Sequence, residues 1–178
     1  MSNKLIPETD VLISTTIFLL KRSVVPYQFS VPRGRGINTK EFKKKLKGVF
    51  NSTDRNPIFT PYGPDIIGAS DKEWWHIECK GAGSGKPQTQ RNNFDRALSS
   101  VVSYFGINKN GFPRYTKNFN QYIGLALPNT QHYIRELTNR VNKKLRKVLN
   151  LWILIHDIDS EKIVPISPNS KYKESSIL

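Results

Sequence analysis

The sequence predicts an α/β fold, because segments with helical periodicity alternate with short apolar segments that are typical of strands. An apolar stripe at helical spacing follows Pro87, and a second helical pattern runs from Gln131 to Leu149. The apolar runs 122–127 and 151–155 read as strands. Since the second run is apolar at every position, we expect it at the middle of a sheet covered on both faces.

The first helix is predicted over the apolar run 11–20, although its β-branched residues leave a strand as the alternative. The run is ten residues long, too short to span a bilayer. Glu8 and Asp10 precede it, where a signal peptide would have a basic start. Both acids suit the positive end of a helix dipole. The predicted buried stripe consists of Ile13, Ile17, Leu20 and Val24.

The next elements are a strand over 26–31, a short helix over 41–47 capped by Asn38 or Thr39, and a loop over 51–61. A hairpin then begins near Asp65 and returns through 73–79. A helix extends from Pro87 to about Phe105, with its stripe formed by Phe94, Ala97, Leu98, Val101, Val102 and Phe105. Pro165 cannot donate a ladder hydrogen bond, so 162–166 is predicted to be an edge strand.

The helix predicted over 131–149 is expected to bury Ile134, Leu137, Val141, Leu145 and Val148, and to expose its basic residues. The chain is expected to form one domain over 1–166, with 33–61 and 106–120 as DNA-facing insertions or loops and with 167–178 as a loose tail.

The composition favours a polyanionic partner. Lys and Arg number 28 against 14 Asp and Glu, which gives a formal net charge of +14. Nucleic acid fits this charge best, and its binding would depend strongly on salt. An anionic membrane surface is the rival, but no basic amphipathic helix stands at a terminus; a solvated basic surface without a partner is the other alternative. The single cysteine cannot form an internal disulfide, which is consistent with a reducing cytoplasm.

Glu78 and Lys80 are the centre of the candidate site. They are two positions apart in a predicted strand, so their side chains leave one face, predicted to be an open surface, while Ile77 and Cys79 point into the core. Pairing across the hairpin would bring Asp65 beside Glu78. The alternative is an exposed turn aspartate and a separate surface ion pair.

Two carboxylates and a lysine supply what metal-assisted phosphodiester hydrolysis requires. Carboxylate oxygens are preferred ligands of Mg²⁺, which lowers the pKa of a water molecule and stabilises charge on the phosphate. Lys80 would orient that water or neutralise the developing charge.

Pro64, Asp65, Glu78 and Lys80 form a pattern that resembles the PD-(D/E)XK nuclease superfamily, which includes restriction endonucleases, Holliday-junction resolvases and repair nucleases. The resemblance implies a restriction-endonuclease-like core with a central mixed β-sheet flanked by helices. It also implies a divalent metal at Asp65, Glu78 and the backbone carbonyl of Cys79, with Mg²⁺ as the cofactor and Mn²⁺ as a substitute.

In the resembling superfamily the first core helix often brings a glutamate to the metal site. Glu8 is the first candidate for this accessory acid and Glu41 the second, and a plain helix-start charge is the alternative for Glu8. Some of these nucleases carry Gln followed four residues later by Tyr. This chain has Gln90 and Phe94, so Gln90 is assigned only a contact to DNA or water.

Basic residues in four kinds of segment are predicted to bind DNA. The segments are the glycine-rich stretches 32–36 and 81–86, the lysine-rich helix 41–47, the helix start after Pro87, and the aromatic and basic loop 106–120. The alternatives are a solvated basic face and aromatic residues that cover an edge of the core. The predicted DNA contacts are Arg33, Arg35, Lys43, Lys44, Lys86, Arg91, Arg114 and Lys117.

The sequence therefore predicts a Mg²⁺-dependent DNA endonuclease, with a type II restriction enzyme as the leading subclass. A Holliday-junction resolvase or repair nuclease is the nearest alternative, and a non-catalytic nucleic-acid-binding protein with the same fold is the alternative from another class. The expected partner is DNA rather than a membrane. A homodimer is also expected, because a single site cuts one strand at a time.

Overall fold

A computed structural model describes residues 5–31, 38–50, 56–83, 87–105 and 120–170. The strands are β1 (Val25–Ser30), β2 (Ile58–Thr60), β3 (Ile66–Ala69), β4 (Glu73–Cys79), β5 (Asn120–Pro128), β6 (Leu151–Asp157) and β7 (Lys162–Ile166). The helices are α1 (Glu8–Lys21), α2 (Thr39–Phe50), α3 (Pro87–Phe105), α4 (Gln131–Arg140) and α5 (Lys143–Leu149). The predicted α/β class is confirmed.

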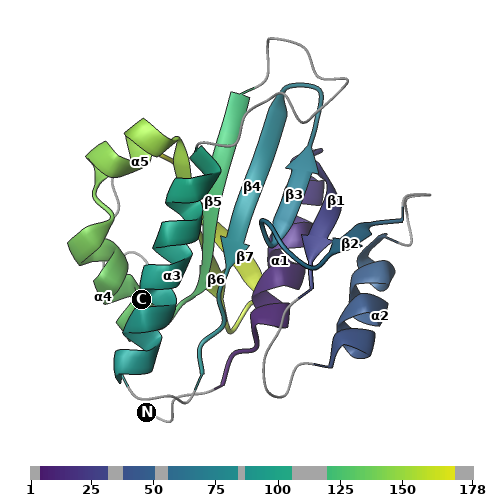
Figure 1. Ribbon diagram of the computed structural model, residues 1–178, viewed down its shortest axis with the longest axis horizontal. Helices are drawn as coiled ribbons and strands as arrows, with labels where there is room; N and C mark the ends of the chain where they lie inside the picture. Colours follow the sequence, from purple (N-terminus) through teal and green to yellow (C-terminus); the bar gives the residue numbers. More distant parts are fainter. Residues whose placement is uncertain (1–4, 32–37, 51–55, 84–86, 106–119, 171–178) are drawn as a thin grey trace.

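The strands form one seven-stranded mixed sheet in the order β2-β1-β3-β4-β5-β6-β7 (Figure 1). β3 and β4 are an antiparallel hairpin, whereas β4, β5 and β6 are parallel neighbours. The parallel pairs require crossover connections, which α3 supplies between β4 and β5, and α4 with α5 between β5 and β6. β4 is therefore the central strand, antiparallel to β3 on one side and parallel to β5 on the other.

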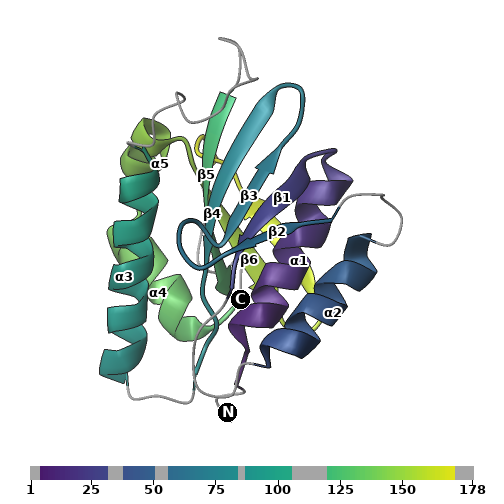
Figure 2. The same cartoon turned by 45° about the vertical axis from the view of Figure 1, so that its right-hand side comes forward.

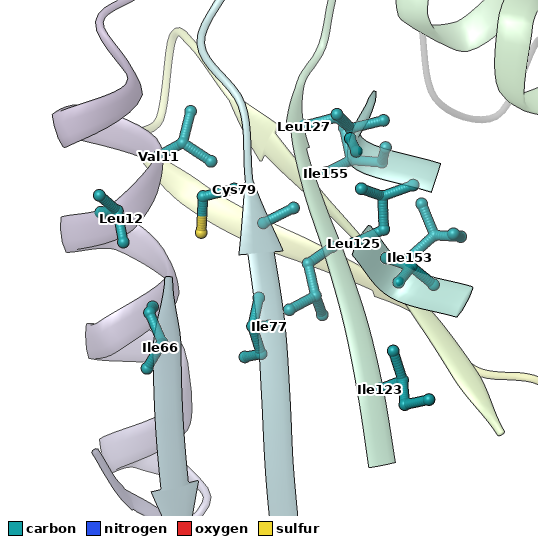
Figure 3. Close-up of a cluster of buried hydrophobic side chains, with 14 of the residues drawn as sticks. Val11, Leu12, Ile66, Ile77, Cys79, Ile123, Leu125, Leu127, Ile153 and Ile155 are labelled. Atoms are coloured by element: carbon teal, nitrogen blue, oxygen red, sulfur yellow. The ribbon is translucent and has the colours of Figure 1, made fainter. Parts of the chain in front are cut away.

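Helices cover both faces of the sheet. α1 crosses one face in contact with β1 and with β3 to β7, and α2 packs on the outside of α1 (Figure 2). α3 lies over β4 and β5 on the other face, where α4 packs against it, and α5 contacts β6. Figure 3 shows Val11 and Leu12 of α1 beside Ile77 and Cys79 of β4. Ile77 and Cys79 thus point into the α1 side of the core, as the strand alternation predicts.

The helix predicted over 131–149 is two helices. Val141 leaves helical geometry, and the side chain of Asn142 accepts a hydrogen bond from the backbone N–H of Leu145 at 2.9 Å, so a new helix starts. Asparagine is a favoured N-cap, which explains the break. The break turns α5 relative to the predicted stripe, and Val148 is 62% exposed instead of buried.

The buried face of α1 differs from the predicted one. Its buried residues are Val11, Leu12, Ser14, Thr15, Thr16 and Leu19, whereas Ile17 is 36% exposed. Two of the three buried hydroxyl groups find acceptors: Thr16 donates to the carbonyl of Leu12 at 2.8 Å and Ser14 to that of Glu161 at 3.0 Å. Of the predicted stripe, Val24 is buried and Ile13 and Leu20 are partly buried against the core, so the prediction is wrong only at Ile17.

The buried face of α3 is confirmed for Phe94, Ala97 and Val101 but not at its end. Val102 and Phe105 are 51% and 55% exposed, and Tyr104 is buried in their place. Positions 94, 97, 101 and 104 follow helical spacing, so the tyrosine continues the stripe.

Four smaller predictions need correction. The loop over 51–61 includes β2, which pairs with β1, and the strand at 151–155 lies next to an edge of the sheet rather than at its middle. The tail does not begin at Ser167. The guanidinium of Arg146, predicted to be exposed, is buried and donates to the carbonyls of Ser167 at 2.7 Å and Ser170 at 2.8 Å.

Candidate active site

The hairpin brings Asp65 to the end of β4. Ile66 of β3 is paired with Ile77 of β4, so Asp65 lies beside the last residues of the central strand. Its Oδ2 accepts a hydrogen bond from the backbone N–H of Cys79 at 2.7 Å. The predicted convergence of Asp65 with Glu78 is therefore built by local strand pairing.

Three carboxylates surround the ammonium of Lys80. Its Nζ is 2.6 Å from Glu78 Oε1, 3.8 Å from Glu8 Oε2 and 3.9 Å from Asp65 Oδ2. The side chains of Glu78, Asp65, Lys80 and Glu8 are 9%, 13%, 19% and 23% exposed, respectively. These four residues, called the acid–lysine cluster below, are thus mostly buried and still reach the surface.

Glu8 reaches the cluster through a contact outside the helices. Ile6 and Ala82 form an antiparallel bridge, with backbone hydrogen bonds of 2.8 Å and 2.9 Å. At the neighbouring Gly81, an added Cβ would lie 2.4 Å from the carbonyl oxygen of Ile6, so only glycine permits this approach. Glu41, the second candidate for the accessory acid, instead forms an exposed pair with Lys45 at 3.2 Å.

Burial controls the electrostatics of the cluster. Desolvation, together with the nearby charge of Glu78, raises the pKa of Asp65 to about 8. Desolvation also raises the pKa of Glu8. For Lys80, burial opposes the charge, but the fields of Asp65, Glu78 and Glu8 outweigh it and hold the pKa above its ordinary value. The cluster is acidic overall and favours an added cation.

Two tyrosines complete the surroundings, and sequence reasoning missed both roles. The hydroxyl of Tyr104 donates to Glu78 Oε2, and that of Tyr133 donates to the carbonyl of Gly81 at 2.9 Å. Both rings come from helices that cover the sheet, α3 and α4. The prediction of an open surface here is wrong, because these helices cover the strand face and leave His76 1% exposed and Glu78 6% exposed.

The donors of the cluster suit a hard divalent cation. Carboxylate oxygens of Asp65 and Glu78 are the ligands that Mg²⁺ prefers. The N–H and C=O of a strand residue leave on the same side, so the carbonyl of Cys79 lies on the side of Asp65. Within the described residues, no three His, Cys, Asp or Glu side chains are already gathered to hold a metal ion. Instead, the carboxylates of Asp65, Glu78 and Glu8 all lie around the ammonium of Lys80.

The other predicted site residues lie apart from the cluster or outside the described residues. The amide of Gln90 donates to the carbonyl of Gly83 at 3.3 Å, and the ammonium of Lys43 lies 4.6 Å from the ring centre of Phe59. Lys44 and Arg91 are exposed on α2 and α3. The residues outside the described ranges are Arg33, Arg35, Lys86, Arg114 and Lys117.

Comparisons of the chain with protein-family models, with curated proteins and with solved structures found no match. The case for a function therefore depends on the geometry and chemistry of the cluster itself. Among the helices of the described ranges, none combines the length and the apolar character needed to cross a bilayer.

Proposed function

We propose that this protein is a Mg²⁺-dependent DNA endonuclease that hydrolyses phosphodiester bonds, with a restriction-endonuclease-like core. The observation that carries the proposal is the convergence of Asp65, Glu78 and Lys80 at the end of β4, with Glu8 as a third acid. These residues come from three separate elements, and a mostly buried cluster of three acids around one lysine is costly to the fold. Such a cost is typical of functional sites.

The place of the cluster in the fold supports binding of an anionic substrate. In open α/β sheets, ligands bind beyond the carboxyl ends of the parallel strands, and the cluster lies at that end of β4. The N-termini of α1 and α3 lie at the same end of the molecule (Figure 1). Helix N-termini present backbone N–H groups and a positive dipole end, which favour phosphate.

The residues would divide the work as follows. Asp65, Glu78 and the carbonyl of Cys79 would hold Mg²⁺, which supplies an activated water and neutralises charge on the phosphate. Lys80 keeps its proton because its acidic neighbours raise its pKa. It therefore acts as a fixed positive charge beside the scissile phosphate and not as a general base. Glu8, beyond Lys80, helps to hold that ammonium in place.

DNA is the substrate that the whole chain favours, since a net charge of +14 attracts a polyanion. Within this proposal, cleavage of duplex DNA by a homodimer of the type II restriction kind is the leading subclass. One cluster per protomer cuts one strand, so two copies would cut both.

A cleavage assay tests the proposal. Purified protein is incubated with linear, supercoiled and branched DNA in Mg²⁺, Mn²⁺ or EDTA, beside the variants Asp65→Asn and Lys80→Ala. We expect cleavage with either metal and none in EDTA. Both variants should lose at least about 100-fold in rate, because Asp65→Asn removes a proposed metal ligand and Lys80→Ala removes the positive charge beside the phosphate. Glu41→Gln is the matched control, since Glu41 is an exposed acid outside the cluster.

The outcomes separate the alternatives. DNA binding without cutting in any metal would contradict the enzyme and favour a binding protein that keeps the fold. Cutting that is unaffected by Asp65→Asn would place catalysis elsewhere in the chain. Cutting confined to branched DNA would favour a junction-resolving or repair nuclease, and mapping of the products on linear DNA would reveal a preferred sequence.

A further inference from the structure

Tyr104 makes a buried hydrogen bond to the candidate ligand Glu78. Its hydroxyl donates to Glu78 Oε2, and both residues are 6% exposed. A hydrogen bond from a neutral donor to a carboxylate is stronger than one between neutral groups, and exclusion of water strengthens it further. The bond therefore strongly constrains the carboxylate.

The two oxygens of Glu78 have different partners. Oε2 faces Tyr104, whereas Oε1 lies 2.6 Å from the ammonium of Lys80. Rotation of the carboxylate would break both contacts at once. The Tyr104 hydroxyl thus occupies Oε2 of Glu78, and Oε1 remains directed at the ammonium of Lys80.

Tyr104 is itself held by three elements of the fold. It lies in the last turn of α3, its backbone carbonyl accepts from the side-chain amide of Gln121 of β5 at 3.3 Å, and its ring lies 6.2 Å from that of His76 of β4. Burial and the charge of Glu78 raise the pKa of the Tyr104 phenol, so the hydroxyl stays protonated and remains a donor. Its position is fixed independently of Glu78.

From this geometry we infer that Tyr104 is a positioning residue, which orients the Glu78 carboxylate so that Oε1 is presented to a divalent cation. The inference rests on the proposed metal-dependent function and extends it to a residue of α3. Groups that hydrogen-bond to metal ligands orient those ligands, and their loss typically costs about 10- to 100-fold in metal affinity or activity. The same loss is expected here for removal of one hydroxyl group.

Metal binding tests the inference without any cleavage measurement. Mn²⁺ affinity is measured by isothermal titration calorimetry for the wild-type protein, Tyr104→Phe, Glu78→Gln and the double variant. Tyr104→Phe should bind Mn²⁺ about 10- to 100-fold more weakly. The double variant should be no weaker than Glu78→Gln alone, because Tyr104 acts only through Glu78. Tyr122→Phe is the matched control, because its ring lies among Trp75 and Trp152 and outside the cluster.

A second measurement covers the case in which Tyr104→Phe does not fold. Fluorotyrosine placed at position 104 or 122 keeps the ring and the hydroxyl group, and fluorine NMR reports its surroundings. Addition of Mg²⁺ should shift the resonance from position 104 and leave that from position 122 unchanged. These results would support the inference.

Three results would overturn the inference. They are a folded Tyr104→Phe with wild-type Mn²⁺ affinity, additive losses of Mn²⁺ affinity in the double variant, or a fluorine resonance from position 104 that does not shift when Mg²⁺ is added. In these cases the proposed metal site stands, provided that Glu78→Gln weakens binding. Absence of Mn²⁺ binding by the wild-type protein would instead reject the metal site, and the role of Tyr104 with it.

Discussion

The acid–lysine cluster places one lysine among three acids, and none of the four side chains is more than 23% exposed. Burial disfavours every charge in such a group, and one ammonium cannot compensate three carboxylates. The cluster therefore lowers the stability of the fold unless a further cation binds. This conflict between stability and site chemistry is common where a protein must hold reactive groups.

Asp65→Asn should stabilise the metal-free protein. The folded state raises the pKa of Asp65 from 3.8 to about 8, so the folded chain keeps a proton that the unfolded chain has lost between these values. The contribution of Asp65 to stability therefore falls as pH rises across this window. Asparagine has no charge to bury, and its carbonyl can still accept from Cys79 N–H.

Urea unfolding in EDTA at pH 5 and pH 8 measures this effect. We expect the free energy of unfolding of Asp65→Asn to exceed that of the wild type by about 1–3 kcal/mol at pH 8, and by less at pH 5. The same variant should not cut DNA. Equal or lower stability of the variant at pH 8 would show that burial of the Asp65 carboxylate does not destabilise the fold.

Asp65, Glu78 and Lys80 were found from the sequence because local rules place them, whereas Glu8 was found only through the resemblance. Spacing of two in a strand puts Glu78 and Lys80 on one face, and the hairpin brings Asp65 to them. Tyr104 and Tyr133 reach the site only through the packing of α3 and α4 across the sheet. That packing joins positions far apart in the chain, for which the local pattern carries no signal.

At the scale of elements, the turn after β4 joins the start of the chain to the site. Gly81 lies against the segment that leads into α1, and an added Cβ would be 2.4 Å from Ile6 O and 2.5 Å from Glu8 N. Both close atoms belong to the backbone, so a side chain here must displace the segment that carries Glu8.

Gly81→Ala should therefore destabilise the fold by about 1–3 kcal/mol, the usual cost of forcing extra atoms into a packed place. Glu8 should also move away from Lys80. Gly48→Ala is a matched control with the opposite expected sign. It lies within α2 with nothing within 4 Å of an added Cβ, and alanine favours a helix by about 0.5–1 kcal/mol over glycine.

Urea unfolding of both variants and of the double variant Gly81→Ala/Glu8→Gln provides the check. The single variant Glu8→Gln completes the comparison, and its effect on stability should be smaller when Gly81→Ala has already displaced Glu8 from Lys80. A Gly81→Ala protein as stable as the wild type would contradict the close approach of the two segments.

Elements were predictable where one strong signal controls them. The edge position of β7 follows from Pro165, whereas apolar content wrongly placed 151–155 at the middle of the sheet, where the structure has β4. The predictions failed where two signals competed, as at Asn142, whose capping propensity divides one apolar stripe between two helices. On α1, the hydroxyl residues that find internal acceptors replace the more apolar Ile17 in the core.

The order of the strands in the whole sheet could not be predicted from the sequence. β1 lies between β2 and β3, so two strands that follow one another in sequence, β2 and β3, are not neighbours in space. This order depends on pairing between distant segments, which no local pattern encodes.

If the protein acts on DNA as proposed, the net charge of +14 and the position of the cluster together predict which basic helix would contact the duplex. The cluster lies at the carboxyl end of β4, and Lys45 of α2 lines a cavity of about 360 Å³ together with Leu5, Ile6 and Asp10 at the start of α1. Lys44 is exposed on the same helix. Lys147 of α5 is equally exposed, but α5 leads into the start of β6, at the opposite end of the parallel strands. A duplex at the cluster should therefore contact α2 and not α5.

Equilibrium binding of a DNA duplex without metal, measured by fluorescence anisotropy between 50 and 200 mM salt, tests this. If about six phosphates are neutralised, wild-type affinity should fall by about 1000-fold over that range. Lys44→Ala should weaken binding and reduce the slope of log affinity against log salt by about one, the mark of one lost phosphate contact. Lys147→Ala removes the same charge far from the cluster and should leave the slope unchanged. A reduced slope for Lys147→Ala alone would place the duplex at the other end of the sheet, away from the acids proposed to hold the catalytic metal.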